Sequence, residues 1–310
     1  MSAALASSSP LQGPVLVTGA GSGIGLAITR ALLAAGLPVF AAARRPAHLQ
    51  MLQGLGATAL RLDVRDAAQV QATARAVAAA GRGLGGLVHN AGVGGLGVLA
   101  SWNDADLHDL FDTNLFGPHR LTRALLPELL QARGRVICIG SMGGTITQPF
   151  LGPYTMSKHA LEAYAACLRP ELAPHGVAVS IVQPGAVATD IGDNGRAGNE
   201  ARLRATEPPF RDAALEMLAA LQSPAPLQPD QPESAGNRRH AAPEQVAAVV
   251  LQALHAPQPQ ARYLVGTRWE GDRVIDTLID RLLDAAGSPA HTMTAQELAA
   301  RIEERRCMRP

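Results

Sequence analysis

The chain has 310 residues, 47% of them hydrophobic and 3% aromatic, which fits one large α/β domain with an aliphatic core. The formal net charge is +1 and the 27 basic residues are dispersed among 26 acidic ones, so a nucleic-acid partner is not expected. The three cysteines form no CxxC pair, and no early apolar run is continuous enough for a membrane span, so we expect a cytoplasmic protein.

Residues 1–12 are small and polar and predict a disordered segment ahead of a single domain over residues 13–310. In that domain, β-rich runs alternate with helical stretches, which predicts a Rossmann-type, doubly wound sheet of seven parallel strands. The candidate strands are residues 14–18, 38–43, 57–62, 86–90, 134–140, 177–183 and 262–266. Ligands of such folds bind at the carboxyl ends of the strands, so functional residues should follow strands.

The segment TGAGSGIG, residues 18–25, follows the first predicted strand and opens a helix. Gly19, Gly23 and Gly25 allow a tight turn and the close approach of a pyrophosphate to the positive end of that helix. Ser22 and Ile24 complete the turn. A purely structural turn is the alternative, but the position between strand and helix favours dinucleotide binding.

The second predicted strand ends at Ala43, near the place where NAD-selective sites carry an acid. Arg44 and Arg45 follow and can hold a 2′-phosphate through forked, charge-assisted hydrogen bonds. We therefore expect NADP(H) as the preferred cofactor, with NAD(H) possible. Two solvated arginines are the alternative.

Two further segments follow strands and are candidates for cofactor contacts, although neither is specific alone. Asp63 and Val64 follow the third predicted strand, where the carboxylate can reach an adenine edge. Asn90, Ala91 and Gly92 follow the fourth and supply small residues near the cofactor.

Tyr154 precedes Lys158, the only lysine of the chain, by four positions, which places both side chains on one helical face. An ammonium near a phenol favours the phenolate, so we expect a lowered pKa for Tyr154 and a role as general acid or base. Ser141, after the fifth predicted strand, can hydrogen-bond a substrate oxygen. Asn114, inside a predicted helix, can hold a water for proton relay.

Beyond residue 189 the alternating pattern stops. Residues 190–243 contain no β-rich run and one helical patch, residues 207–222, which predicts a substrate-loop or lid insertion; a helix packed on the core is the alternative. Residues 267–310 are expected to form a helical extension with two helices from Asp272 onward. In the first of these, Val274, Ile275, Leu278, Ile279, Leu282 and Leu283 recur at helical spacing and predict a packing stripe.

These motifs together resemble the classical short-chain dehydrogenase/reductase family. The resemblance covers residues 14 to about 190 and rests on TGxxxGIG, NAG, Asn114, Ser141, YxxxK and the segment PGAVAT, residues 184–189. The stretch from Gln148 to Thr189 is further similar to the hydroxysteroid and retinol dehydrogenase branch.

The resemblance implies a sheet in the order 3-2-1-4-5-6-7 and hydride transfer between a nicotinamide and a carbonyl or alcohol carbon. It implies a catalytic tetrad, and it implies that the loop after the sixth strand contacts the nicotinamide. The tetrad is Asn114, Ser141, Tyr154 and Lys158, and the loop residues are Pro184, Gly185, Val187 and Thr189. It also implies a homodimer or homotetramer with contacts through the helices around residues 113–131 and 154–173.

We therefore expect an enzyme that interconverts a hydrophobic ketone or aldehyde and the corresponding alcohol, with Tyr154 as general acid or base. The alternatives are a non-catalytic NADP-binding sensor or scaffold and an NAD-linked, hydroxysteroid-type alcohol dehydrogenase. A nucleotide-sugar epimerase or dehydratase is disfavoured by the glycine spacing. No metal site is expected, because the nine histidines are scattered.

Overall fold

The computed structural model describes residues 11–189, 191–223 and 227–308. The predicted N-terminal disorder falls mostly on residues 1–10, which lie outside the described residues. Leu11 is described and packs against the core, so the ordered chain includes at least part of that segment.

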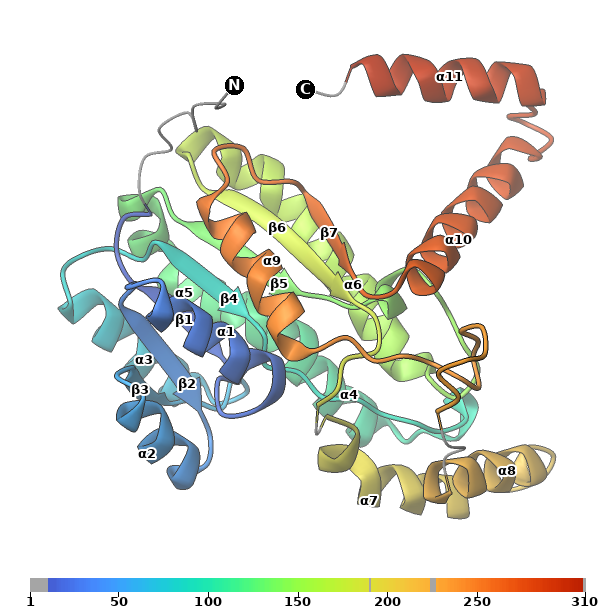
Figure 1. Cartoon of the computed structure of the whole chain (residues 1–310), viewed down its shortest axis with the longest axis horizontal. Coiled ribbons are helices and arrows are strands. Elements are labelled where there is room, and N and C mark those ends of the chain that lie inside the picture. The colour runs from blue at the N-terminus through green and yellow to red at the C-terminus, as the bar shows by residue number, and fades with distance from the viewer. Residues whose placement is uncertain (1–10, 190, 224–226, 309–310) are drawn as a thin grey trace.

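Seven parallel strands form one sheet in the order β3-β2-β1-β4-β5-β6-β7, as expected (Figure 1). They are β1 (Val15–Thr18), β2 (Val39–Ala43), β3 (Thr58–Arg61), β4 (Gly86–His89), β5 (Arg135–Ile139), β6 (Ala178–Pro184) and β7 (Arg262–Val265). The order reverses at β1, which pairs with both β2 and β4. Such a reversal opens a crevice at the carboxyl ends of the strands.

Helices cover both faces of the sheet and make two apolar cores. The first face carries α1 (Gly23–Ala34), α2 (Pro46–Gly54) and α9 (Pro243–His255). The second carries α3 (Ala67–Ala79), α5 (Gly117–Ala132) and α6 (Gly152–Leu172). Central strands such as β1 are buried along their whole length because both faces are covered.

The insertion after β6 contains two helices, α7 (Ile191–Arg204) and α8 (Arg211–Gln222), so the expectation of one helical patch was wrong. Leu203, Ala214 and Leu218 form a small core between them, against which Phe150 packs. Arg202 fastens α7 to the preceding part of the fold, because it donates to the Leu96 carbonyl at 3.1 Å. Its guanidinium also lies 4.2 Å from the centre of the Trp102 ring.

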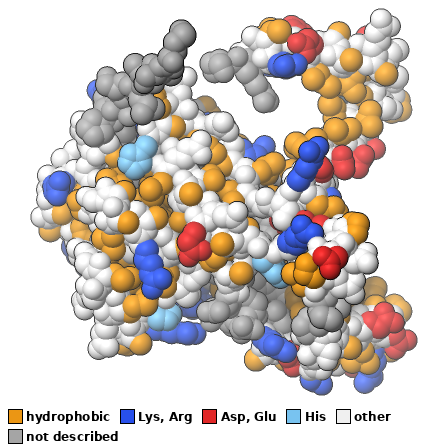
Figure 2. Space-filling view, in the orientation of Figure 1, with side chains coloured by type: hydrophobic (Ala, Val, Ile, Leu, Met, Phe, Trp, Pro, Cys, Tyr) orange, Lys and Arg blue, Asp and Glu red, His pale blue; other side chains and the backbone are white. Residues whose placement is uncertain are grey.

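The C-terminal extension forms an arm of two helices, α10 (Arg268–Ala286) and α11 (Ala295–Cys307), as expected (Figure 1). The predicted packing stripe is wrong for most of its members. Val274 is buried, but Ile275, Leu278, Ile279, Leu282 and Leu283 are 39–54% exposed because the arm projects away from the sheet. Figure 2 shows apolar side chains along this arm. No helix among the described residues is long and apolar enough to cross a bilayer.

Candidate active site

A cleft of about 380 Å³ lies at the carboxyl ends of the central strands. It brings together every predicted site residue except Gly25 and Asn114. The predicted residues that line it are Gly19, Ser22, Gly23, Ile24, Arg44, Arg45, Asp63, Val64, Asn90, Ala91, Gly92, Ser141, Tyr154, Lys158, Pro184, Gly185, Val187 and Thr189.

The strand order gives the cleft two distinct ends. Arg44 and Asp63 follow the outer strands β2 and β3, whereas Ser141 and Gly185 follow β5 and β6 on the other side of β1. A ligand that fills the cleft can therefore contact arginines at one end and the serine and tyrosine at the other.

The glycine turn leaves the first turn of α1 open to a ligand. Gly19 and Gly23 have φ of 63° and 50°, values that glycine adopts without strain. Ser22 is the N-cap residue, but its side chain makes no capping hydrogen bond. The N–H groups at this helix end can therefore bind an anion. Gly25 supports the turn from below, since a Cβ there would overlap the Gly19 carbonyl.

Asn90 fixes the same turn from the neighbouring strand. Its Nδ2 donates to the carbonyl oxygens of Thr18 at 2.9 Å and of Gly19 at 3.2 Å. The Ala91 N–H donates to the Thr18 hydroxyl at 3.0 Å. The NAG segment thus holds the turn in place rather than only lining the cleft.

Asp63 carries a charge network at the arginine end. Arg65 donates to both of its carboxylate oxygens, at 3.2 and 3.0 Å, and this hydrogen bonding holds the pKa of Asp63 below its ordinary value. Arg44 lies farther away, with Nη1 3.9 Å from Asp63, and its side chain is 60% exposed. Because its side chain is mostly exposed, the Arg44 guanidinium is accessible to an anionic ligand.

His48 also lines this end of the cleft, and the sequence analysis missed it. It lies in the first turn of α2 and packs onto the glycine turn, where a Cβ at Gly21 would overlap the imidazole. Its spacing of four residues from Arg44 is the signal that could have found it. The other lining residues that were missed are Gly21, Leu62, Val93, Gly94, Thr113, Ile139, Gly140 and Gly195.

Ser141, Tyr154 and Lys158 meet at the opposite end. Ser141 caps a short 3₁₀ turn after β5, and its Oγ accepts from the Gly143 N–H at 3.0 Å. The buried Lys158 Nζ donates to the Ile139 carbonyl at 2.9 Å and lies 5.8 Å from the centre of the Tyr154 ring. The first turns of α6, which carry Tyr154 and Lys158, therefore place both functional groups beside the serine.

The expected lowering of the Tyr154 pKa is wrong for this structure. Burial raises the pKa of Tyr154, and a hydrogen bond with Ser141 offsets only part of that effect. Burial also lowers the pKa of Lys158 to about 8, because the ammonium has left water. The phenol is thus protonated at neutral pH, and the lysine still carries its charge there.

Asn114 lies beneath the cleft in a π-helical turn, residues Asp112–Phe116, between α4 (Asp104–Phe111) and α5. Its Oδ1 accepts from the Val93 N–H at 2.8 Å, and its Nδ2 donates to the Val93 carbonyl at 2.9 Å and to the Ser157 hydroxyl at 3.0 Å. These bonds join the loop after β4 to α6. Asn114 therefore positions the loop after β4 against α6 and does not line the cleft.

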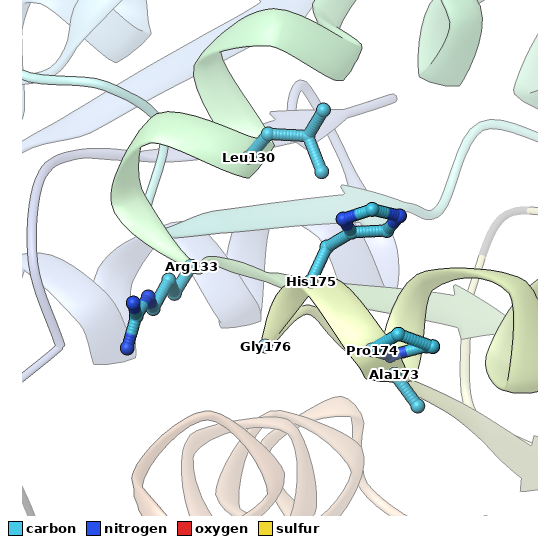
Figure 3. Close-up of a pocket in the computed structure, with 6 residues that line it drawn as sticks. All are labelled: Leu130, Arg133, Ala173, Pro174, His175 and Gly176. Carbon is cyan, nitrogen blue, oxygen red and sulfur yellow. The ribbon is translucent and has the colours of Figure 1, made fainter.

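A second pocket, of about 550 Å³, lies at the opposite edge of the sheet (Figure 3). Its lining comes from Leu130 and Arg133 before β5 and from Ala173, Pro174, His175 and Gly176 before β6. Because ligands of parallel sheets bind at the carboxyl ends of the strands, we assign the functional site to the cleft that contains Ser141 and Tyr154.

A family model for short chain dehydrogenases matches residues 14–200, which include the whole constellation described above. The chain belongs to the short-chain dehydrogenase family. It is an NAD(P)-dependent oxidoreductase of CH–OH and C=O groups, in the sense of that family.

The relatives of this short-chain dehydrogenase agree with the family assignment. It is 33% identical to the NADPH-dependent 3-dehydrocapnine reductase of Ornithobacterium rhinotracheale, over 87% of this chain and 94% of that protein. It is 39% identical to mouse retinol dehydrogenase 5, over 57% of each, as the expected branch implies. The solved structure of a variant actinorhodin polyketide ketoreductase with NADPH is 31% identical, with a TM-score of 0.65, and covers 81% of this chain and 94% of that one.

Proposed function

We propose that this short-chain dehydrogenase is an NADP(H)-dependent reductase of hydrophobic ketones or aldehydes, which also catalyses the reverse oxidation of the alcohol. The observation that carries the proposal is the cleft with arginines at one end and Ser141, Tyr154 and Lys158 at the other. The NADPH named for the 3-dehydrocapnine reductase and for the ketoreductase structure supports the choice of cofactor.

The cleft fits a dinucleotide phosphate by its chemistry. The glycine turn and the open end of α1 suit a pyrophosphate, and Arg44, Arg45 and His48 suit a 2′-phosphate. When bound, NADPH supplies the hydride that reduces the carbonyl carbon. Val187 and Thr189, at the other end, are proposed to hold the nicotinamide.

The side chains at the reacting end suit proton donation to a carbonyl oxygen. The raised pKa of Tyr154 keeps its phenol protonated at neutral pH, so it acts as the general acid in the reductive direction. The Lys158 ammonium stabilises the phenolate that remains, and the Ser141 hydroxyl hydrogen-bonds the substrate oxygen. The reverse oxidation releases a proton, so high pH favours it.

One apolar side chain near the reacting end, Phe150, supports a hydrophobic substrate. Phe150 precedes Tyr154 by four residues and packs against the core of the α7–α8 hairpin. Met142 follows Ser141 but is buried against the end of β7, so it belongs to the core. The hairpin is therefore proposed as the lid that selects the substrate.

We further propose that the chain assembles as a homodimer or homotetramer in the cytoplasm. Phe116, Leu130 and Met156, on or beside α5 and α6, are 36–48% exposed, as an interface through these helices requires. The free thiols of Cys138, Cys167 and Cys307 suit a reducing compartment.

The test is a spectrophotometric screen of ketones and alcohols with NADPH and NADH, repeated with Tyr154→Phe. The substitution removes the proton donor, so turnover should fall by at least about 100-fold while NADPH still binds. Tyr164→Phe, on the same helix but outside the cleft lining, is the matched control and should retain turnover. NADPH binding without turnover of any carbonyl class would favour the sensor, and full turnover of Tyr154→Phe would exclude the mechanism.

A further inference from the structure

Glu270 is a buried carboxylate that the reaction described above does not use. It lies in the first turn of α10, directly after β7, and is 2% exposed. It closes a capping box, because its N–H donates to the Thr267 hydroxyl at 3.3 Å and its Oε2 accepts from the Thr267 N–H at 3.2 Å. Helix capping alone explains only one of its two oxygens.

The capping box of α11 shows that capping does not require burial. Glu297 makes the same reciprocal bonds with Thr294, and it is exposed to solvent. Burying a carboxylate costs free energy unless the charge is paired and hydrogen-bonded. The burial of Glu270 therefore points to contacts beyond its own helix.

Those contacts lead to the loop at the reacting end of the cleft. Glu270 Oε1 accepts from the Ala186 N–H at 2.7 Å and forms an ion pair with Arg238. Gly185 and Gly266 make the room, since a Cβ at either position would overlap the Glu270 carboxylate. One side chain thus joins α10, the loop 185–189 and the end of the insertion.

The backbone reinforces this junction. The Ala241 N–H donates to the Ala186 carbonyl at 2.8 Å, and the Ala188 N–H donates to the Ala241 carbonyl at 3.0 Å. The loop 185–189 is therefore held by Glu270 and by the last residues of the insertion. Its far end, Thr189, reaches the glycine turn, where a Cβ at Gly23 would lie 3.1 Å from the Thr189 Cβ.

We propose that Glu270 is a positioning residue that holds the loop 185–189 against the nicotinamide end of the cofactor and, through Arg238, couples that loop to the substrate-binding insertion. The proposal rests on the proposed function for the identity of the ligand. It assigns Glu270 no contact with cofactor or substrate. Arg238 provides the coupling, because it belongs to the insertion and forms the ion pair with Glu270.

The test compares two ligands that share one end. NADPH reaches both ends of the cleft, whereas adenosine 2′,5′-bisphosphate carries the 2′-phosphate but no nicotinamide. Glu270→Gln offers one acceptor oxygen where the carboxylate has two, so it cannot satisfy Ala186, Thr267 and Arg238 together. By calorimetry, its Kd for NADPH should rise by about tenfold, and its Kd for the bisphosphate should stay within about twofold.

Further variants distinguish an effect on the position of the loop 185–189 from a general disruption of the fold. Arg238→Ala should shift the NADPH affinity in the same direction, Arg238→Lys should restore most of it, and Glu297→Gln in the exposed capping box should change neither Kd. Arg238 is 35% exposed, so its variants keep the test intact should Glu270→Gln fail to fold.

The positioning role would be overturned if Glu270→Gln and Arg238→Ala lost affinity for both ligands equally. It would also be overturned if neither variant lost affinity for either ligand. These are binding measurements, so a difference between the ligands supports the role of Glu270 even where no carbonyl compound is turned over. Turnover by the unsubstituted protein together with an unchanged NADPH affinity in both variants would overturn the inference about Glu270 alone.

Discussion

The requirement for lysine at position 158, in a chain that otherwise uses arginine for its strong cations, follows from burial. Lys158 is 6% exposed and directs one N–H to the Ile139 carbonyl. Burial lowers its pKa to about 8, so the charged form is only moderately favoured at neutral pH. A guanidinium stays charged even when it is buried, and it is larger and planar. Burying an arginine at this position would therefore cost more free energy than burying the lysine.

The preference for NADP(H) is tested at the arginine end of the cleft. Replacing Arg44 and Arg45 together with alanine should raise the Kd for NADPH by at least about tenfold, because each charge-assisted hydrogen bond to a phosphate contributes about 1.5–3 kcal/mol. The Kd for NADH should change by less than about twofold, since NADH lacks the 2′-phosphate. Fluorescence titration with both cofactors measures the two constants.

The control for these arginines is Arg61→Ala, which removes an exposed arginine at the end of β3 that does not line the cleft. It should leave both cofactor affinities unchanged. An equal loss of NADPH and NADH affinity in the double variant would show that the arginines support the fold of the cleft and do not select a phosphate.

At the level of elements, all seven strands lie within one residue of the bounds predicted from their sequence pattern. Strands buried on both faces are continuous apolar runs bordered by turns, so the local sequence is enough to predict their bounds. The helix α7 was missed because it contains Gly192, Gly195 and Gly198 and few apolar residues. Its order comes from contacts distant in sequence, such as the bonds of Asn199 and Arg202 to the backbone of Leu96.

The candidate site was also predicted where local sequence places its residues, and missed where contacts distant in sequence place them. Residues that directly follow a strand, such as Ser141, are placed by strand register and were found. His48 and Glu270 were missed because they contact glycines of other segments, Gly21 and Gly185. Their local signals, the spacing from Arg44 and a capping box, do not reveal these contacts. The pKa of Tyr154 was predicted in the wrong direction because burial outweighs its neighbours, and burial is a property of the folded chain.

The strand β4 contains a titratable group that should set the acid stability of the sheet. His89 is 2% exposed, its Nε2 lies 2.7 Å from the Thr122 hydroxyl, and burial lowers its pKa to about 3. Below pH 6.5 the unfolded chain binds a proton at His89 that the folded chain does not, so stability falls as pH falls. Between about pH 6 and the folded-state pKa of about 3, this single group should lower the free energy of unfolding by about 1.4 kcal/mol per pH unit.

Urea unfolding between about pH 7 and pH 5, above the range in which most carboxylates titrate, measures this effect. His89→Gln cannot take up the proton, so its free energy of unfolding should depend less steeply on pH. His291→Gln, at an exposed position of the loop between α10 and α11, should keep the slope of the unsubstituted protein. Identical slopes in all three proteins would show that His89 does not govern the acid response.

For the whole molecule, the two helices of the C-terminal extension differ in how much they pack against the domain. The start of α10 is integrated, because Glu270 and Val274 are buried. Farther along the helix, Arg281 donates to the Thr145 carbonyl at 2.7 Å. The helix α11 has no buried residue and makes the end of the projecting arm. Within the described residues, α10 is therefore joined to the fold and α11 forms a peripheral arm.

Deletion of residues 288–310 tests this division. Since α11 buries little apolar area against the domain, the deletion should change the free energy of unfolding by less than about 1 kcal/mol and leave NADPH affinity unaltered. Deletion from residue 268 removes Glu270 and Val274 and should destabilise the fold strongly. Urea unfolding and sedimentation velocity, measured on all three chains, compare stability and assembly. A marked loss of stability or a smaller assembly after the shorter deletion would show that α11 packs against the domain or against another chain in solution.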